Sequence, residues 1–192
     1  MNSKNYNPEI HHRRSIRLKY YDYNQAGAYF ITICVQDKKC LLGKIKEGLN
    51  QINQYGKIVE EIWNYLPIHF PKIEIDGAVI MPNHFHGIIV INEYQKFGES
   101  FKGGRKKDLE RAGKFYDKKT FLGSVIAYFK YETTKLINLQ RDSPGVKFWQ
   151  RNYYEHIVRN EDSLNILRNY IVENPLRWEI DVLHPDNLTG VW

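Results

Sequence analysis

Residues 73–91 read IEIDGAVIMPNHFHGIIVI and predict two β-strands joined by a tight connection. Isoleucine and valine dominate both halves, and these β-branched side chains favour strands. The Pro82-Asn83 pair interrupts the pattern, because proline cannot donate a hydrogen bond to a strand ladder. We therefore expect strands at 73–81 and 84–91 that pair in antiparallel fashion.

The sequence on either side of this pair interleaves strand and helix patterns. Strands are predicted at 28–36 and in a hairpin at 41–52, and helices at 55–66, from the cap Thr120 onward, and at 160–174. Pro67 and Pro175 are expected to end two of these helices, because the residue before a proline disfavours helical geometry. The interleaved order predicts an α+β fold with helices on one face of a sheet.

The composition predicts a globular domain. Its 192 residues suffice for a single domain with its own core, and an apolar share of 42% favours a folded chain. The sequence contains no apolar run of about eighteen residues, so no membrane span is expected. Cys34 and Cys40 give neither a metal-site spacing nor a disulfide scaffold. The basic N-terminus lacks an apolar signal core, so a cytoplasmic location is expected.

The charge balance suits a polyanionic partner. Lysine and arginine total 28 against 22 acidic residues, which gives a net charge of +6. We expect a basic N-terminal arm at 1–27 and a charge-rich, mobile loop at 95–118. Either these cations are simply solvated, or some of them contact DNA phosphates. The candidates for phosphate contact are Arg13, Arg14, Arg17, Lys106, Lys107 and Arg151.

The His84-Phe85-His86 triplet is the first candidate for chemistry. Residues two apart on a strand point to the same side, so both imidazoles can converge on one metal ion. Phe85 would then turn into the opposite layer. The alternative interpretation is a chance pair of histidines near a turn.

Tyr170 and Asn174 form the second candidate. They lie four residues apart on the last predicted helix and so share one of its faces. The Asn174 amide oxygen could be a third ligand beside the two imidazoles, with the Tyr170 hydroxyl next to the same ion. Nitrogen and oxygen ligands of this kind favour Mg²⁺ or Mn²⁺. Alternatively, Tyr170 only packs and Asn174 is an ordinary residue at a helix end.

Several longer stretches resemble one known family. They are RRSIRLKYYDYNQAGAYFITICVQDKKCLLG (13–43), MPNHFHGIIV (81–90), KFWQRNYYEHIVRNEDSL (147–164) and NYIVENP (169–175). They are similar to the REP-associated tyrosine transposases, a branch of the single-tyrosine HUH transposases of bacterial insertion sequences. The resemblance covers most of the chain outside 95–118, and the order of the motifs is more specific than any one of them.

The resemblance implies a ferredoxin-like sandwich whose central antiparallel sheet carries the histidine pair. It implies that His84, His86 and Asn174 bind a divalent metal ion and that Tyr170 is the nucleophile. Tyr153 and Tyr154 do not occupy the nucleophile position of the motif. Asparagine at 174 matches the REP-associated branch, which implies a monomer, although other members are homodimers.

The implied function is that of a metal-dependent single-strand DNA endonuclease and strand transferase. It would form a 5′-phosphotyrosine intermediate and act on hairpin-containing DNA. Two alternatives remain open. One is a domesticated, non-catalytic regulator that binds DNA hairpins, and the other is a phosphodiesterase that uses activated water.

Overall fold

A computed structural model describes residues 22–93 and 120–187 of the chain. Most of the predicted basic arm, with Arg13, Arg14 and Arg17, lies outside these residues. So does the predicted loop 95–118, with Lys106 and Lys107. Among the residues described, no helix is both long enough and apolar enough to cross a membrane.

The centre of the molecule is an antiparallel four-stranded sheet with the strand order β4-β5-β1-β6. The strands are β1 (Gly27–Cys34), β4 (Ile73–Ile80), β5 (His84–Ile91) and β6 (Tyr154–Val158). Helix α1 (Gln54–His69) lies between β1 and β4 in sequence, and α3 (Phe121–Gln140) lies between β5 and β6. This β-α-β-β-α-β order is ferredoxin-like, as expected, and the predicted pairing of 73–81 with 84–91 is confirmed.

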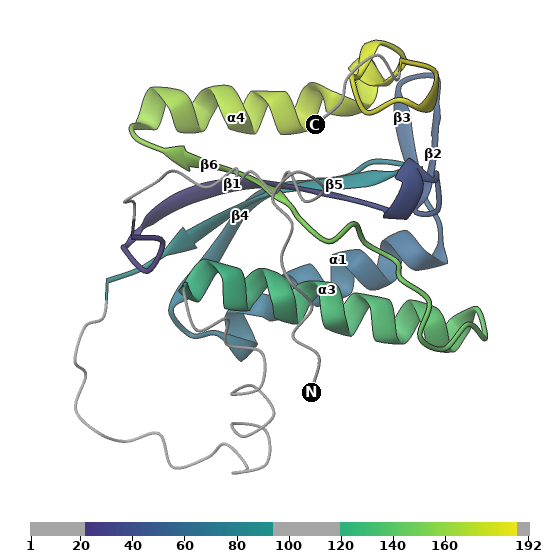
Figure 1. The fold of residues 1–192 in the computed structure, drawn as a ribbon. Coiled ribbons are helices and arrows are strands. Elements are labelled where there is room, and N and C mark those ends of the chain that lie inside the picture. Colours follow the sequence, from purple (N-terminus) through teal and green to yellow (C-terminus); the bar gives the residue numbers. More distant parts are fainter. Residues whose placement is uncertain (1–21, 94–119, 188–192) are drawn as a thin grey trace, which may run out of the picture.

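The helices cover both faces of the sheet. Helices α1 and α3 lie on one face, and α4 (Glu161–Glu173) lies on the other (Figure 1). The expectation of helices on one face alone is therefore wrong for α4. The physical reason lies in β1 and β5, which are buried on both sides. Strands with apolar residues at nearly every position need a cover on each face.

The two layers differ in size. The layer towards α1 and α3 holds the main core, where Trp63 meets Phe85 at 4.8 Å and Phe129 at 5.8 Å between ring centroids. The layer towards α4 holds a small buried cluster of Phe30, Ile88 and Ile171. Helix α4 therefore rests on fewer apolar contacts than the other two helices.

A hairpin and a capping residue precede α1. Strands β2 (Gly43–Lys46) and β3 (Leu49–Ile52) form a separate two-stranded sheet, which confirms the predicted hairpin. Its turn residues Glu47 and Gly48 both have positive φ, as type I′ turns require. The side chain of Asn53 then accepts hydrogen bonds from the first backbone N–H groups of α1.

Helix α1 does not end before Pro67, contrary to the expectation. It continues to His69, and the backbone N–H of Phe70 still bonds to the carbonyl of Leu66 at 2.8 Å. Pro67 cannot donate to the Trp63 carbonyl and its ring crowds that carbonyl, but the bond from Phe70 N to Leu66 closes the last turn beyond it. The buried side chains of Trp63 and Leu66 hold this turn against the core.

Side chains cap the two later helices, and the predicted cap Thr120 is one of them. Thr120 accepts a hydrogen bond from Gly123 N, and Asn160 accepts one from Ser163 N. After Pro175 the chain continues in a 3-10 turn, η2 (Asn174–Ile180), and a shorter one, η3 (Pro185–Asn187). A third such turn, η1 (Gln36–Lys38), follows β1, so the strand predicted for 28–36 ends earlier, at Cys34.

The end of the predicted arm is not free. The side chain of Tyr23 is only 4% exposed, and its ring lies 6.2 Å from that of Tyr29. The Asn24 side chain also accepts a hydrogen bond from Phe121 N at the start of α3. Tyr23 and Asn24 therefore attach residues 22–26, which precede β1, to the domain.

Candidate active site

Strand β5 presents His84 and His86 on the face covered by α4. The two side chains are 0% and 3% exposed, and their ring centroids lie 4.6 Å apart. They stand opposite Cys34 and Thr32 of β1 in the sheet register. Phe85 points into the main core, as the alternation of a strand predicts.

A hydrogen bond orients each imidazole ring. Nδ1 of His86 lies 2.8 Å from Oγ1 of Thr32, and Nδ1 of His84 lies 2.7 Å from Oδ1 of Asn83. Such partners leave the other ring nitrogen, Nε2, free to face the site, and they fix the ring orientation as metal-binding proteins commonly do. Neither Thr32 nor Asn83 is among the site residues that the sequence predicts.

Both histidines are neutral at physiological pH. Burial lowers the pKa of His84 well below its usual value, and the nearby His86 and Lys38 lower it further. Burial also lowers the pKa of His86, to about 3. Neutral imidazole is the form that binds metal ions, so no proton competes at this pair near neutrality.

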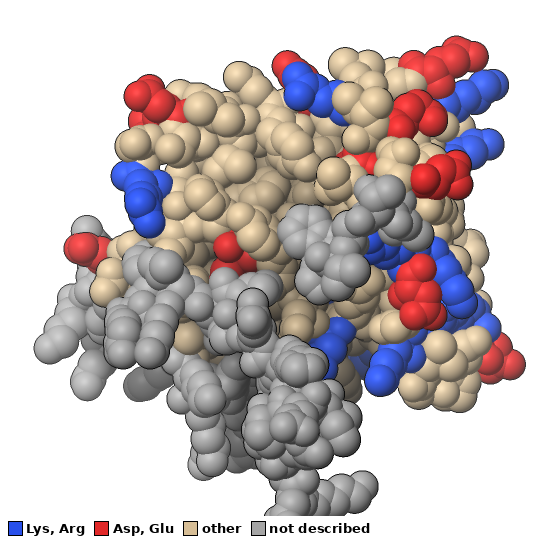
Figure 2. Space-filling model, turned by 45° about the horizontal axis from the view of Figure 1, so that its top comes forward, with Lys and Arg blue, Asp and Glu red and all other residues tan. Residues whose placement is uncertain are grey.

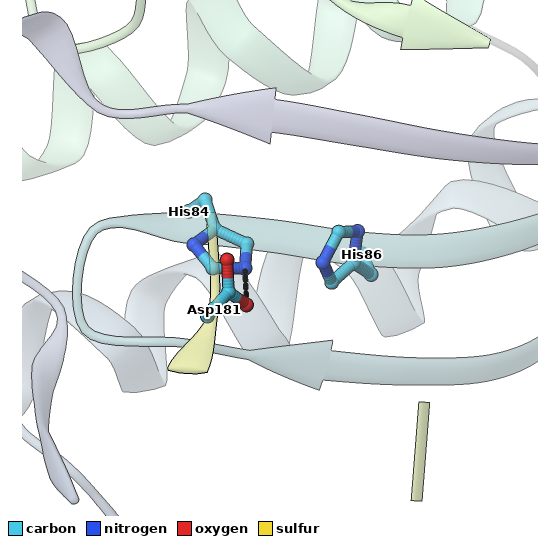
Figure 3. Close-up of side chains that lie close together, drawn as sticks. All are labelled: His84, His86 and Asp181. Atoms are coloured by element: carbon cyan, nitrogen blue, oxygen red, sulfur yellow. Dashed lines mark ion pairs between the residues drawn. The ribbon is translucent and has the colours of Figure 1, made fainter. Parts of the chain in front are cut away.

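The Asp181 carboxylate, just past η2, joins the two histidines. Its Oδ2 atom lies 3.8 Å from Nε2 of His84, and the two groups face each other (Figure 3). Among the residues described, His84, His86 and Asp181 form a group that could hold a metal ion, with their ligand atoms within 4.8 Å of one another. The sequence prediction lacks Asp181, because it lies in an irregular segment with no periodic pattern.

The Tyr170 side chain of α4 reaches the same site. Its hydroxyl lies 3.4 Å from Nε2 of His86, and its ring meets the His86 ring edge-on at 5.2 Å. The side chain is 37% exposed, so a substrate can reach it. One chain therefore places the predicted nucleophile beside His86, one of the predicted metal ligands.

The surroundings of Tyr170 keep its hydroxyl protonated. Burial raises the pKa of Tyr170, and the Asp181 carboxylate raises it further. The Asn174 side chain and the Arg177 guanidinium act in the opposite direction. A cation beside the hydroxyl would favour the phenolate and so oppose the effect of burial.

The unpaired atoms of the site fit a divalent cation. Nε2 of His84 and Oδ1 of Asn174 are buried and have no hydrogen-bond partner. Each such atom costs about 1–3 kcal/mol when it stays unsatisfied. Both atoms offer a lone pair, so a cation satisfies them where a further acceptor would not. Imidazole, amide and carboxylate groups are also ordinary ligands of Mn²⁺, and the oxygen groups are those of Mg²⁺.

Arg151 is the one predicted phosphate contact within the described residues. It is exposed and follows Gln150, whose backbone N–H bonds to the carbonyl of Cys34 at 2.9 Å. Cys34 stands opposite His84 in the sheet, and the Arg151 carbonyl accepts a hydrogen bond from Nζ of Lys130 of α3 at 3.0 Å. On the face shown in Figure 2, lysine and arginine side chains mix with acidic ones beside a broad uncharged area.

Comparison with known proteins places the chain in a family. No family model matches the sequence. A Haemophilus influenzae protein, described only as uncharacterized, is 45% identical over 184 residues, which cover 94% of this chain and 98% of that protein.

Two solved structures are similar to the chain. A REP-associated tyrosine transposase bound to a REP hairpin has a TM-score of 0.50 and 18% identity, over 84% of this chain and 74% of that one. A candidate transposase from Deinococcus radiodurans has a TM-score of only 0.41 and 12% identity, over 83% of this chain and 98% of that one. The chain thus belongs to one family with the Haemophilus protein, and its fold is that of the REP-associated tyrosine transposase.

Proposed function

We propose that this protein is a metal-dependent single-strand DNA endonuclease and strand transferase of the transposase type. The observation that carries the proposal is the Tyr170 hydroxyl, 3.4 Å from Nε2 of His86 within one chain. A nucleophile beside a pair of neutral, buried imidazoles suits phosphoryl transfer that passes through a covalent intermediate. The solved transposase with this fold binds a REP hairpin, which supports hairpin-containing DNA as the substrate class.

His84, His86 and Asn174 would hold the metal ion, for which we propose Mg²⁺ or Mn²⁺. When bound, the ion would supply positive charge that polarises the scissile phosphate and favours the phenolate of Tyr170. The protein contributes the positions of the groups. The ring centroids of Phe30 and His86 lie 5.9 Å and 5.2 Å from that of Tyr170. Both rings therefore restrict where the Tyr170 hydroxyl can point.

The reaction balances without a high-energy cofactor. The Tyr170 oxygen forms a bond to phosphorus, and the bond from phosphorus to the 3′-oxygen breaks. The phenol loses its proton, and the departing 3′-oxygen gains one from solvent. The products are a 5′-phosphotyrosine link and a 3′-hydroxyl. A second 3′-hydroxyl can attack the link, which restores Tyr170 and joins a new strand.

The DNA contacts and the setting of the protein follow from the same proposal. Arg151 would bind a phosphate of the DNA backbone, and the basic residues 13, 14, 17, 106 and 107 would add further phosphate contacts. We propose that the chain acts as a single domain, as a monomer and in the cytoplasm, where its DNA substrate would be found.

Formation of a covalent DNA adduct tests the proposal. Labelled single strands from the flanks of the gene, palindromes included, are incubated with the protein and Mn²⁺ and then separated on a denaturing gel. We expect an adduct with wild type, none with Tyr170→Phe, and none with wild type in EDTA. Tyr131→Phe is the matched control, because Tyr131 is an exposed tyrosine of α3 on the opposite face of the sheet.

The outcomes separate the alternatives. An adduct that survives Tyr170→Phe would refute the assignment of the nucleophile. Cleavage without any adduct favours the phosphodiesterase that uses water. Binding without cleavage favours the non-catalytic hairpin regulator.

A further inference from the structure

His84 and Asp181 face each other at a distance that leaves room for a metal ion between them. Nε2 of His84 is fully buried and has no hydrogen-bond partner, and Oδ2 of Asp181 lies 3.8 Å away. That distance is too long for a hydrogen bond. It is shorter than a metal–nitrogen and a metal–oxygen bond of about 2.1 Å each laid end to end, so one ion can bond to both atoms.

The proton on His84 is fixed by Asn83. The Asn83 side chain donates hydrogen bonds to the carbonyls of Lys38 and Leu183, at 3.2 Å and 2.7 Å. Its amide nitrogen is thereby occupied, and its oxygen faces Nδ1 of His84 at 2.7 Å. Since that oxygen can only accept, Nδ1 of the neutral ring must carry the proton. The lone pair of His84 is then on Nε2, towards Asp181.

The position of the carboxylate is fixed as well. The backbone N–H of Leu183 donates to Oδ1 of Asp181 at 2.6 Å, which leaves Oδ2 to face the histidine. The carbonyl of the same Leu183 accepts from Asn83. The backbone N–H of Asp181 also bonds to the carbonyl of Trp178 at 3.0 Å. One asparagine therefore holds both the histidine and the segment that carries the carboxylate.

We propose that Asp181 is a further protein ligand of the divalent ion, and that Asn83 is the positioning residue that aligns it with His84. This inference rests on the metal-dependent function proposed above and adds a specific residue to it. The two imidazoles and the Asn174 amide carry no net charge. Asp181 supplies the carboxylate that Mg²⁺ and Mn²⁺ prefer among protein ligands.

Direct measurement of Mn²⁺ binding tests the ligand. Free Mn²⁺ is followed by electron paramagnetic resonance as it is added to the full-length protein without DNA. We expect Asp181→Asn to raise the Kd for Mn²⁺ by about 10-fold or more, the scale at which even the partners of metal ligands act. Asp186→Asn, whose side chain is 89% exposed in the same segment, should leave the Kd unchanged. An unchanged Kd in Asp181→Asn overturns the proposal.

The variant is chosen so that the fold survives. Asparagine at 181 keeps the oxygen that accepts from Leu183 N, and a thermal melt without metal checks this directly. The failures are also distinguishable. If His84→Ala abolishes Mn²⁺ binding and Asp181→Asn leaves it unchanged, Asp181 is not a ligand, but the metal dependence proposed above still stands. If wild type does not bind Mn²⁺, this proposal fails together with metal dependence, whereas the adduct assay tests Tyr170 separately.

Asn83 has its own spectroscopic test. Nitrogen chemical shifts of ¹⁵N-labelled histidine report which ring nitrogen carries the proton. In wild type without metal we expect His84 protonated on Nδ1. In Asn83→Ala we expect a larger share protonated on Nε2, together with a weaker Mn²⁺ affinity. A wild-type His84 protonated on Nε2 would contradict the positioning role.

Discussion

Replacing Gly87 by alanine should push β5 away from the core. A Cβ at this position would lie 2.6 Å and 2.7 Å from Cζ2 and Cη2 of Trp63, and 2.9 Å from Cε1 of Phe85. Distances this short require the indole ring or the strand to move. Both are confined, because Trp63 is 3% exposed and the neighbouring His86 carries a hydrogen bond to Thr32.

The size of the effect follows from the cost of overpacking a core. An extra carbon in a packed interior costs about 1–3 kcal/mol. For a chain of this length each kcal/mol lowers the Tm by about 2–4 °C, so the expected loss is roughly 2–12 °C. Gly77→Ala in β4 is the matched control, because its Cβ would lie 3.4 Å from the nearest atom, an ordinary contact. We expect the control to change the unfolding free energy by about 0.5 kcal/mol or less.

A double-mutant cycle identifies the cause. Trp63→Phe removes the two indole atoms that the new Cβ would meet, and it also removes an indole N–H that has no hydrogen-bond partner. In urea unfolding, the penalty of Gly87→Ala should fall by about 1 kcal/mol in the Trp63→Phe background. An equal penalty in both backgrounds would exclude a clash with Trp63, and a Gly87→Ala variant that unfolds like wild type would exclude overpacking at this position.

Three further predictions concern the site and its supports. The Arg168 hydrogen bonds lower the pKa of Asp76 in the folded protein. The ionised carboxylate therefore stabilises the fold at pH values above its unfolded pKa of about 3.9. This stabilisation is lost as the pH falls through the lower pKa of the folded state. The stability difference between wild type and Asp76→Asn in urea should therefore shrink from pH 6 to pH 3, and a constant difference would contradict it. Thr32→Val removes the partner of His86 Nδ1 and should weaken Mn²⁺ binding by about 10- to 100-fold in a titration, with no change expected if that contact is incidental. Arg151→Ala should make the salt dependence of single-strand DNA binding shallower by about 0.7 in a log–log plot, and an unaltered slope would exclude a phosphate contact there.

Much of the fold could be predicted because its signals are local. The β-branched residues within 73–91 predict both strands, and the two-residue period of side chains along a strand places Phe85 opposite the histidines. Hydrogen-bonding side chains mark the starts of two helices, at Thr120 and Asn160. Such patterns depend only on neighbours within a few residues, which is why the sequence reveals them.

The features that the sequence does not predict depend on contacts between distant segments. Asn83 reads as a turn residue, yet its side chain binds the carbonyls of Lys38 and Leu183. Asp181 lies beside His84 in a segment that Asn83 binds through the carbonyl of Leu183. The second helical face was indicated by the nearly continuous apolar run of β5, which an alternating one-sided strand would not show. Its cover, α4, has a modest apolar face, with Ile171 as its buried residue.

The unequal layers give the two halves of the site different stabilities against local opening. The histidines belong to a central strand, so their separation requires loss of the main core. Tyr170 belongs to α4, which is held by the Phe30, Ile88 and Ile171 cluster and by the bond from Arg168 to Asp76. Amide hydrogens of α4 should therefore exchange through a sub-global opening, faster than those of α1 and α3. The proposed nucleophile would thus be released by local opening of α4, while the strand that carries the proposed metal ligands would open only when the whole domain unfolds.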